Sequence, residues 1–445
     1  MKIIDINQPV STEINFESEV DKEITLKGMI RSMRILGWGG FLIIRTGGYS
    51  IQSVYDKNTI NIDPDILTVE SAIEVKGTVK AAKIKDKSIL PSEYELHIKE
   101  IKILSQPSEN PLPIDTTKKE INVGLDTNLD MRPLTLRHFT NRAVFKIQSV
   151  IFNEFGNFLT RNGFTRICTP KIVYSGAEGG ANIFKLDYFG RNAYLAQSPQ
   201  FYKQMMVGVF NRVFEEAPVF RAEKHDTARH LNEYISLDLE MGFIDDFYDI
   251  IKTEVNLLNH IFTQIKSQCT YEIELLGIEI PTIDKIICYK LSEVHEIINN
   301  EYQKDYRGEP DLAPEEERFI CEYVKKHNNT DFVFVTHFPT EKRPFYTMDD
   351  KSSPGETCSF DLIYKGLEIT TGGQRLHNYN DYITKMTSFG LDTTLFESYL
   401  QCFKYGMPPH GGLGLGLERL TALLCNISNV KEASLFPRDI KRLEP

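Results

Sequence analysis

A change in the spacing of apolar residues divides this chain. Between residues 22 and 105, apolar and β-branched residues alternate in the short runs EITLKGMIR, GFLIIRT, YSIQSVY, AIEVKGTVK and YELHIKEIKIL. This is the period of half-buried strands. From Val144 onward the apolar residues recur at helical spacing, through Ile147, Ile151 and Phe155, until Gly163. The chain is therefore predicted to contain two domains that are built differently.

A stretch rich in proline, serine and charge, SQPSENPLPIDTTKKE, lies between the two patterns and is typical of a linker. Five short strands before it suit a small barrel of the OB type. We expect an OB-fold domain over 1–105, a linker or hinge over 106–135 and a catalytic domain over 136–445.

The second domain mixes strand-like and helical segments. RVFEEAPVFRAE, LNEYISLDLEMGF and CSFDLIY alternate with helical patterns at 246–267, 314–327, 380–389, 394–404 and 416–425. Consecutive strands joined by turns such as Lys365-Gly366 favour a largely antiparallel sheet and an α+β fold. The sequence has no GxxxxGK[ST] and no GxGxxG after a strand, so neither a P-loop nor a Rossmann site is supported.

Composition narrows the function classes. No apolar stretch approaches the roughly 20 residues that span a bilayer, so we expect a cytoplasmic protein without a membrane partner. Seven scattered cysteines without CxxC spacing argue against a disulfide framework or a zinc site. The net charge is -11, so nucleic acid must be bound through a local patch. One such patch could be formed by Lys76, Lys80, Lys83, Lys85 and Lys87.

Three polar segments are suited to binding a nucleotide. In VFRAEKHDTARHLNEYISLDLEM, Arg221 leaves a strand and offers a planar fork of donors to a phosphate. In GGLGLGLERL, glycines allow close approach of a flat ligand, and Arg419 follows in a helix. In SFDLIYKGLEITTGGQR, Asp361 and Glu368 lie on two strands of a hairpin, an arrangement suited to Mg²⁺ shared with a polyphosphate.

Together these motifs resemble those of class II aminoacyl-tRNA synthetases. FRAE and RHLNE with the downstream GLGLGLERL are similar to the second and third signature motifs, and GFTRICTPKI, with Pro170, resembles the first. Within the class, the resemblance is to aspartyl enzymes of the archaeal and eukaryotic type and covers nearly the whole chain. It implies a six-stranded antiparallel sheet flanked by helices and a homodimer formed through the first motif.

The segment AQSPQFYKQM is similar to the QSPQxxKQ of aspartyl enzymes, which implies that Gln200 and Lys203 reach the substrate L-aspartate. Lys203 and Arg375 would hold its side-chain carboxylate. Aspartate and asparagine are nearly isosteric, so the pocket must separate them by charge. We expect bound asparagine to leave both cations without an anion, at a cost of about 2–5 kcal/mol. The resemblance adds to this pocket Glu178, Tyr346 and the Gly416 backbone.

The resemblance also implies ATP as a substrate and Mg²⁺ as its companion. Arg221 would bind the α-phosphate and Arg419 the adenine and γ-phosphate, which makes them the catalytic, charge-neutralising groups. The remaining nucleotide contacts would come from Glu223, His230, Leu231 and Glu368. The Mg²⁺ positions are Asp361, Glu368 and Thr371; here TTGGQR departs from the more common SSGAQR, so threonine stands where serine is usual.

In this family the barrel binds the tRNA anticodon, where aromatic stacking and base-edge hydrogen bonds suit a single-stranded loop. Phe41 would stack on a base, Gln52 would read the central base, and Glu95 would contact the third. The alternative for Phe41 is a residue of the barrel core.

The resemblance implies aspartyl-adenylate formation and transfer of aspartate to tRNA-Asp, and three alternatives stay open. A relaxed enzyme would also charge tRNA-Asn. A paralogue could use the adenylate to make a free amide, although such relatives tend to lose the barrel. A tRNA-binding module without activity is disfavoured because the arginines and acids of the ATP site are present.

Overall fold

The computed structural model describes residues 14–174 and 182–444. The chain forms two compact units, Met1–Asn141 and Arg142–Pro445. Within the described ranges, no helix combines the length and apolar character needed to cross a membrane.

The first unit is a closed five-stranded barrel, which confirms the expected OB fold. Its strands pair in the order β1-β2-β3-β5-β4, and a 3₁₀ helix, Pro64–Ile66, precedes β4. Alternate residues of each strand point inward, so that in β4 the side chains of Ile73, Val75 and Val79 are buried. The strand bounds are β1 Glu23–Ile35, β2 Gly39–Arg45, β3 Ser50–Asp56, β4 Ala72–Ala81 and β5 Tyr94–Ser105.

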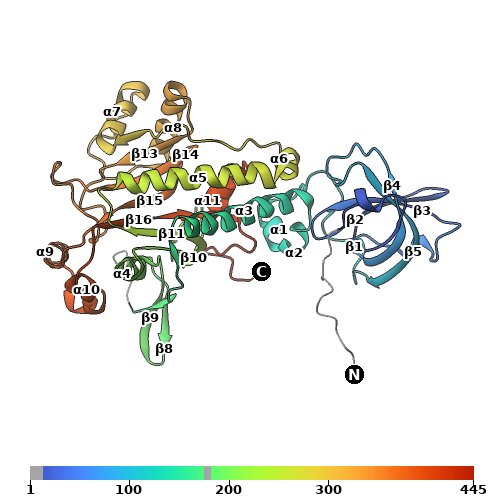
Figure 1. Cartoon of the computed structure of the whole chain (residues 1–445), viewed down its shortest axis with the longest axis horizontal. Helices are drawn as coiled ribbons and strands as arrows, with labels where there is room; N and C mark the ends of the chain where they lie inside the picture. Colours follow the sequence, from blue (N-terminus) through green and yellow to red (C-terminus); the bar gives the residue numbers. More distant parts are fainter. Residues whose placement is uncertain (1–13, 175–181, 445) are drawn as a thin grey trace. The chain divides into compact units, whose positions relative to one another are not determined.

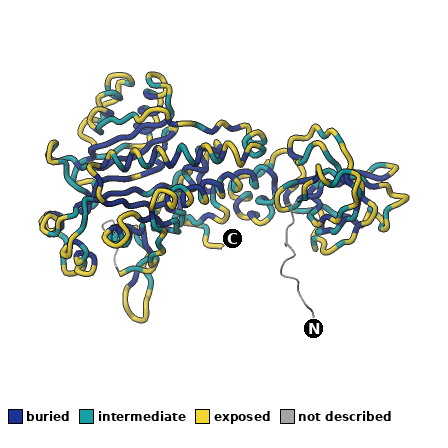
Figure 2. The backbone as a smooth tube through the Cα atoms, in the orientation of Figure 1, coloured by how far each residue is buried: buried dark blue, intermediate teal, exposed yellow. Residues whose placement is uncertain are grey.

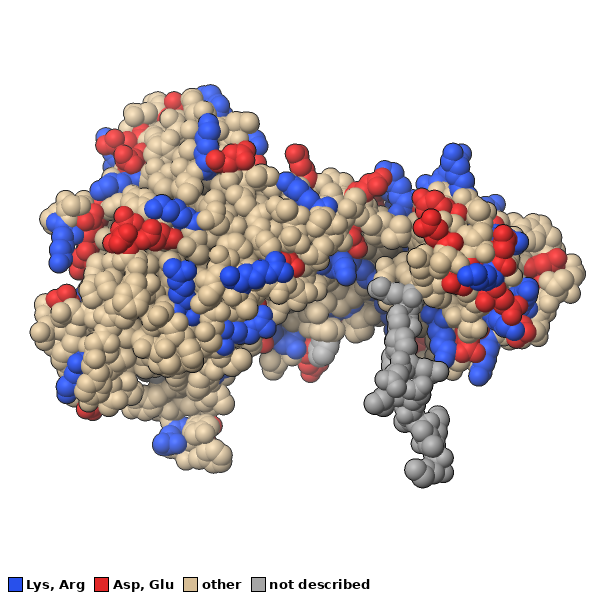
Figure 3. All heavy atoms as spheres, viewed as in Figure 1, with Lys and Arg blue, Asp and Glu red and all other residues tan. Residues whose placement is uncertain are grey.

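Two short helices follow the barrel, α1 (Leu125–Asp130) and α2 (Arg132–Thr135), within the stretch expected to be a linker. The lysine-rich segment is partly neutralised: Lys76 Nζ lies 2.8 Å from a carboxylate oxygen of Glu23, and Lys80 Nζ lies 2.7 Å from one of Asp21. Figure 3 shows basic and acidic side chains side by side on the barrel. The segment therefore does not act as a purely positive surface.

The second unit is built on an eight-stranded sheet in the order β12-β13-β14-β15-β16-β11-β10-β6. The six strands from β13 to β10 pair antiparallel, as the resemblance implied. Two short edge strands, β12 and β6, add parallel pairs that were not anticipated. The bounds are β6 Thr165–Arg166, β10 Arg212–Phe220, β11 Glu233–Gly242, β12 Cys288–Lys290, β13 Phe332–Thr336, β14 Ser359–Tyr364, β15 Leu367–Arg375 and β16 His410–Gly416.

One face of this sheet is apolar. Helices α3 (Phe139–Arg161) and α5 (Tyr248–Gln268) run along it (Figure 1). Their apolar stripes join the inward residues of β11, β14 and β16 in one buried core. In Figure 2 the central strands are accordingly dark blue, whereas the two helices change between dark blue, teal and yellow along their length. The candidate site lies on the opposite face, where β11 presents the polar side chains of Ser236 and Asp238.

The remaining helices surround the sheet. Those at 248–268, 314–328, 379–388, 397–404 and 417–424 match predicted helical segments, but the helix at 291–302 was not predicted. A small sheet in the order β7-β9-β8 carries a hairpin with Phe189 at its turn, 90% exposed. The bounds are β7 Ile172–Val173, β8 Lys185–Tyr188, β9 Arg191–Leu195, α4 Gln200–Phe210, α6 Thr270–Leu276, α7 Leu291–Tyr302, α8 Pro314–Asn328, α9 Tyr379–Ser388, α10 Glu397–Lys404 and α11 Leu417–Leu424.

Candidate active site

The floor of the site is formed by β11 and β16. In β11, Leu237 and Leu239 belong to the apolar core, so Asp238 and Glu240 point to the other face. Opposite them in register lie Gly414 and Gly412 of β16. A Cβ atom added to Gly412 would lie 2.1 Å from the Leu239 carbonyl oxygen and 2.2 Å from Glu240 Oε2. The glycine at this position therefore makes room for a buried carboxylate beside the strand.

A cavity of about 170 Å³ opens above this floor. It brings together side chains that lie far apart in the sequence, from α4, β15, α11 and the segment between β10 and β11. Among the predicted residues it is lined by Gln200, Lys203, Arg221, Glu223, His230, Leu231, Tyr346, Glu368, Thr371, Arg375, Gly416 and Arg419. Asp361 is not part of the lining, and Glu178 lies outside the described residues.

Lys203 and Arg375 meet at one end of the cavity, and both are buried. Lys203 Nζ donates to Asp238 Oδ1 at 2.8 Å and to the Leu413 carbonyl oxygen at 2.9 Å, and it lies 3.4 Å from Glu240 Oε2. Arg375 donates from Nε to Glu240 Oε1 at 3.0 Å and from one terminal nitrogen to the Gly412 carbonyl oxygen at 3.0 Å. Each predicted cation thus has a partner from β11.

These contacts correct the charge argument made from the sequence. Asp238 and Glu240 already balance the two cations, so a bound asparagine would not leave Lys203 or Arg375 without an anion. Burial alone would raise the pKa of Glu240, but Arg375 and Lys203 hold it below its ordinary value. What distinguishes the two amino acids is instead the kind of atom: a carboxylate offers only acceptors to these donors, whereas an amide turns an N–H group toward them.

A hydrogen-bonded layer supports this end of the cavity. Gln200 Nε2 donates to Gln204 Oε1 at 3.1 Å, and Gln204 in turn bonds to the Tyr382 and Tyr399 hydroxyls and approaches His410. Burial lowers the pKa of His410 to about 4, so its imidazole is neutral at neutral pH. The Arg375 guanidinium lies over the Tyr346 ring, 5.5 Å from its centre. These contacts therefore hold the side chains at this end of the cavity in place.

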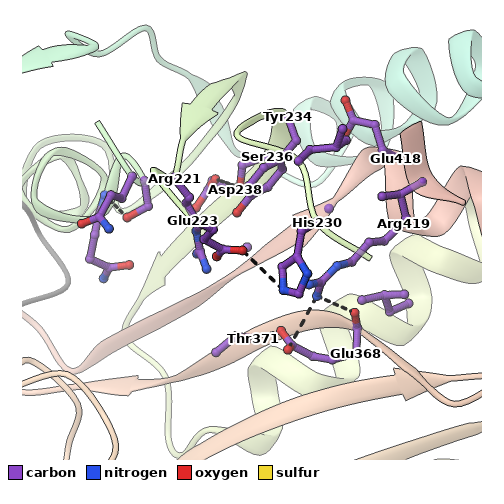
Figure 4. A pocket seen from close by; sticks show the side chains of 18 of the residues that line it. Arg221, Glu223, His230, Tyr234, Ser236, Asp238, Glu368, Thr371, Glu418 and Arg419 are labelled. Carbon is purple, nitrogen blue, oxygen red and sulfur yellow. Dashed lines mark hydrogen bonds and ion pairs between the residues drawn. The ribbon is translucent and has the colours of Figure 1, made fainter. Parts of the chain in front are cut away.

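The other end of the cavity is formed where the chain leaves β10 and enters β11 (Figure 4). Asn232 holds the segment between β10 and β11 in place, because its Nδ2 donates to the carbonyl oxygens of Arg221 at 2.7 Å and Glu223 at 3.1 Å. Across the gap, His230 Nε2 lies 3.4 Å from Glu223 Oε2. Burial lowers the pKa of His230, which favours the neutral ring.

Arg419 reaches the same end from α11 (Figure 4). It donates to the Glu368 carbonyl oxygen at 2.8 Å and lies 3.6 Å from that residue's carboxylate. The Thr371 hydroxyl donates to Glu368 Oε1 at 2.7 Å. Glu418 accepts hydrogen bonds from the Ile235 backbone N–H and so ties α11 to β11. Arg419 of the third motif and Arg221 of the second motif thus line the same cavity.

Asp361 and Glu368 lie on the two strands of the β14–β15 hairpin, as predicted, but in register Asp361 lies opposite Thr371, and Glu368 lies opposite Ile363. One carboxylate oxygen of Asp361 accepts a hydrogen bond from Arg343 at 2.8 Å, and the other is buried without a hydrogen-bond partner in the described structure. Burial raises the pKa of Asp361 to about 7, although Arg343 opposes this shift. A cation could use the unpartnered oxygen, so the acids and the Thr371 hydroxyl fit Mg²⁺, which takes oxygen ligands.

The predicted anticodon residues share the outer face of the barrel. Phe41 is half-buried rather than a core residue, and it lies opposite Arg34 and Val54 on the neighbouring strands. Gln52 Nε2 donates to Glu95 Oε2 at 2.8 Å, so these two predicted readers contact each other directly.

Several residues of the site were missed. Asp238 and Glu240 could have been found, because SLDLEM alternates and places the two acids with Ser236 on the polar face of a strand. Asn232 lies within the RHLNE segment, but its contacts with Arg221 and Glu223 were not anticipated. Arg343 carries no such signal, since its partner Asp361 lies 18 positions away. The same is true of Arg229, which lines the cavity and contacts Glu317 of α8.

Comparison with known families agrees with both units. Residues 24–104 match the model of the OB-fold nucleic acid binding domain. Residues 124–440 match the model of tRNA synthetases class II (D, K and N).

Individual relatives match over almost the full length. The chain is 43% identical to an aspartate–tRNA(Asp/Asn) ligase of Deinococcus radiodurans, covering 95% of both chains. It is 42% identical to one of Thermus thermophilus, covering 97% of this chain and 99% of the relative.

Solved structures match as well. An asparaginyl-tRNA synthetase of Pyrococcus horikoshii gives a TM-score of 0.87 at 29% identity, covering 96% of this chain and 97% of that one. A putative aspartyl-tRNA synthetase of Leishmania major gives 0.84 at 30%, covering 100% and 97%. With these matches and a site that unites the second and third signature motifs, the chain belongs to the class II tRNA synthetases of the D, K and N group.

Proposed function

We propose that this synthetase activates L-aspartate with ATP and transfers it to the 3′ end of tRNA. One observation carries the proposal. A single cavity holds a buried lysine–arginine pair, Lys203 and Arg375, at one end and the arginines of the second and third motifs, Arg221 and Arg419, at the other. The first end suits an amino acid with an acidic side chain, and the second end suits a nucleoside triphosphate.

In the first step, an oxygen of the aspartate α-carboxylate attacks the α-phosphorus. The bond between that phosphorus and the pyrophosphate oxygen breaks, and pyrophosphate leaves with its electron pair. The attacking group is already ionised, so no general base is required. Arg221 and Arg419 neutralise charge on the phosphates, while Arg375 and Lys203 hold the substrate in position.

Mg²⁺ would be held by Glu368 and Thr371 together with the free oxygen of Asp361. When bound, this ion would neutralise and orient the phosphates. Arg343 keeps the Asp361 carboxylate facing the strand pair, since it donates to one oxygen and stacks on the Phe338 ring, 3.7 Å from its centre.

The names of the relatives support aspartate rather than asparagine as the amino acid. The Deinococcus and Thermus proteins are both aspartate ligases, although the solved structures include an asparaginyl enzyme of similar fold. An asparagine amide would turn N–H groups toward the donors of Arg375 and Lys203, and each unsatisfied buried group costs about 1–3 kcal/mol.

We propose that the barrel binds the anticodon through Phe41, Gln52 and Glu95. We further propose that the enzyme acts in the cytoplasm as a homodimer formed through the first motif. The segment around Pro170 supports the dimer, because Cys168 and Pro170 are exposed and Ile172 is 49% exposed. The intact barrel also speaks against an amide-forming paralogue.

The finer proposal concerns the tRNA. Both relatives carry names that include tRNA-Asp and tRNA-Asn, so we propose the relaxed form that charges both. Aminoacylation of separate tRNA-Asp and tRNA-Asn transcripts with radiolabelled aspartate tests this proposal. We expect aspartate on both transcripts. Charging of tRNA-Asp alone would refute the relaxed specificity, and charging of neither would refute the proposed function.

A further inference from the structure

The outer face of the barrel carries apolar side chains next to Gln52 and Glu95, the two polar residues proposed to read bases. Along β2 and β3, the half-buried residues Phe41, Ile43 and Val54 alternate with core residues and therefore point outward. The Gln52–Glu95 pair lies among them. A surface that combines open ring area with amide and carboxylate groups is suited to unpaired nucleobases.

A second aromatic ring borders this face. Trp38, the only tryptophan of the chain, lies in the turn between β1 and β2 and is 47% exposed. Its ring packs edge-to-face against Phe41, with 5.9 Å between the ring centres and 85° between the planes. An edge-to-face pair with this exposure leaves aromatic surface uncovered beside Phe41.

The turn that carries Trp38 is well defined. The Leu36 N–H donates to the Gly39 carbonyl oxygen at 2.8 Å, and the Lys57 N–H donates to the Trp38 carbonyl oxygen at 3.2 Å. A Cβ atom on Gly39 would lie 2.0 Å from the Tyr55 carbonyl oxygen, so this close approach requires glycine. Trp38 is thus presented by a fixed backbone, which lowers the entropic cost of binding.

Exposed cations flank the ring. Arg34 pairs in register with Phe41, and Lys57 follows the end of β3. Both can reach a phosphate of a strand whose bases lie on the aromatic pair. This combination of stacking surface and cations favours RNA over an apolar protein partner at this turn.

We propose that Trp38 is a second stacking platform, which binds an unpaired base adjacent to the base on Phe41. The inference rests on the proposed anticodon role of the barrel and extends it. A base stacked on an aromatic side chain contributes roughly 5- to 150-fold to affinity.

Fluorescence of the full-length chain tests the proposal directly, because Trp38 is its only tryptophan. The probe is a short RNA hairpin whose loop carries the anticodon GUC, compared with a fully paired duplex of the same length. We expect the hairpin to quench the Trp38 emission and the duplex to leave it unchanged. Saturable hairpin binding without a change in emission would overturn the proposal.

Variants separate this inference from the anticodon role itself. Trp38→Leu should weaken hairpin binding at least about fivefold. Trp38→Phe keeps an aromatic ring and should restore most of the affinity. Phe189→Leu is the control, because Phe189 is an exposed aromatic residue of the other unit, and it should have no effect on hairpin binding. Aspartate-dependent ATP–pyrophosphate exchange without tRNA should be unchanged in all three. If Phe41→Leu loses binding but Trp38→Leu does not, Trp38 is not a platform, although the barrel still binds the anticodon. If the wild-type chain does not prefer hairpin to duplex, the anticodon role fails and the inference with it.

Discussion

At the scale of single residues, Lys203 shows how much of the substrate pocket depends on partners outside its own motif. The lysine is only 2% exposed, and its ammonium group is held between Asp238 and the Leu413 carbonyl oxygen. A buried ion pair that loses one member leaves an uncompensated charge. We therefore propose that Lys203 serves both the fold and the substrate.

Replacing Lys203 by methionine keeps the length of the side chain but removes its charge. We expect kcat/KM for aspartate-dependent pyrophosphate exchange to fall on the order of 100-fold or more, and unfolding to become easier by about 3–5 kcal/mol. Exchange kinetics and denaturant unfolding measure the two effects.

Lys325→Met is the matched control, because Lys325 is exposed and pairs with Asp331 at 2.9 Å on the surface. It should leave both quantities unchanged. A Lys203→Met variant with wild-type kcat/KM would show that this lysine does not contact the substrate.

The motif around Lys203 made this residue predictable, but its environment was not. A lysine in QSPQFYKQ has the appearance of a solvated helix residue until α4 is placed against β11. Asp238 could be assigned to the polar face of its strand from alternation alone. Its pairing with Lys203 could not, since 35 positions separate the two residues and no local rule links them.

At the scale of elements, strand β16 is where glycine is required for packing. Gly412 lies against Leu239 and Glu240, so its replacement pushes on both the β11 backbone and the anion that holds Arg375. Gly416, at the end of the same strand, has no neighbouring atom closer than 3.7 Å to an added Cβ. The two glycines therefore differ in the tolerance of their surroundings.

Gly412→Ala should lower the free energy of unfolding by about 1–3 kcal/mol through overpacking, whereas Gly416→Ala should change it little. Denaturant midpoints of the two variants measure the difference. Equal stability of both variants would contradict the packing described for β11 and β16.

Helix α5 carries an acid into the apolar side of the sheet. Burial raises the pKa of Glu254 from an ordinary value of 4.5 to about 8, and a contact with Thr370 only partly opposes this. Between these pH values the folded chain keeps a proton that the unfolded chain has lost. Below pH 4.5, Glu254 therefore makes its full contribution to the free energy of unfolding. This contribution falls as the pH rises toward 8, by at most about 1.4 kcal/mol per pH unit.

Glu254→Gln removes this titration while keeping the shape of the protonated acid. We expect the variant to lose less stability than the wild type between pH 5 and 8, as measured by denaturant unfolding across that range. Glu322→Gln, at an exposed position of α8, should keep the wild-type slope. An unchanged slope in Glu254→Gln would show that this carboxyl group does not titrate between the two states.

Element prediction worked where periodicity was long and failed where elements were short. The stripe of α5 and the alternation of β10 and β11 were evident in the sequence. The edge strand β12, only three residues long, has no period to detect, and it exists because a neighbouring strand offers free backbone groups, whereas β6 lies within the strand-like segment TRICTP. The stretch with α1 and α2 looked like a linker because its prolines and charges conceal two short helices.

At the scale of the whole molecule, the two units divide the two recognition tasks that the proposed function requires. The catalytic unit has donors for an acidic amino acid at one end of its cavity and arginines for a nucleotide at the other. The barrel has outward aromatic rings, together with Gln52 and Glu95, which are proposed to read bases. On the proposed function, amino-acid choice and tRNA choice would rest on different sets of residues, which is consistent with strict aspartate selection combined with relaxed tRNA selection.

Amino-acid-dependent ATP–pyrophosphate exchange, measured with aspartate and with asparagine, tests the central claim most directly. We predict that aspartate supports exchange, that asparagine supports it at least about tenfold less well, and that Arg221→Ala abolishes it without unfolding the chain. Asparagine-supported exchange at an equal or higher rate, or full activity in a folded Arg221→Ala variant, would contradict the account.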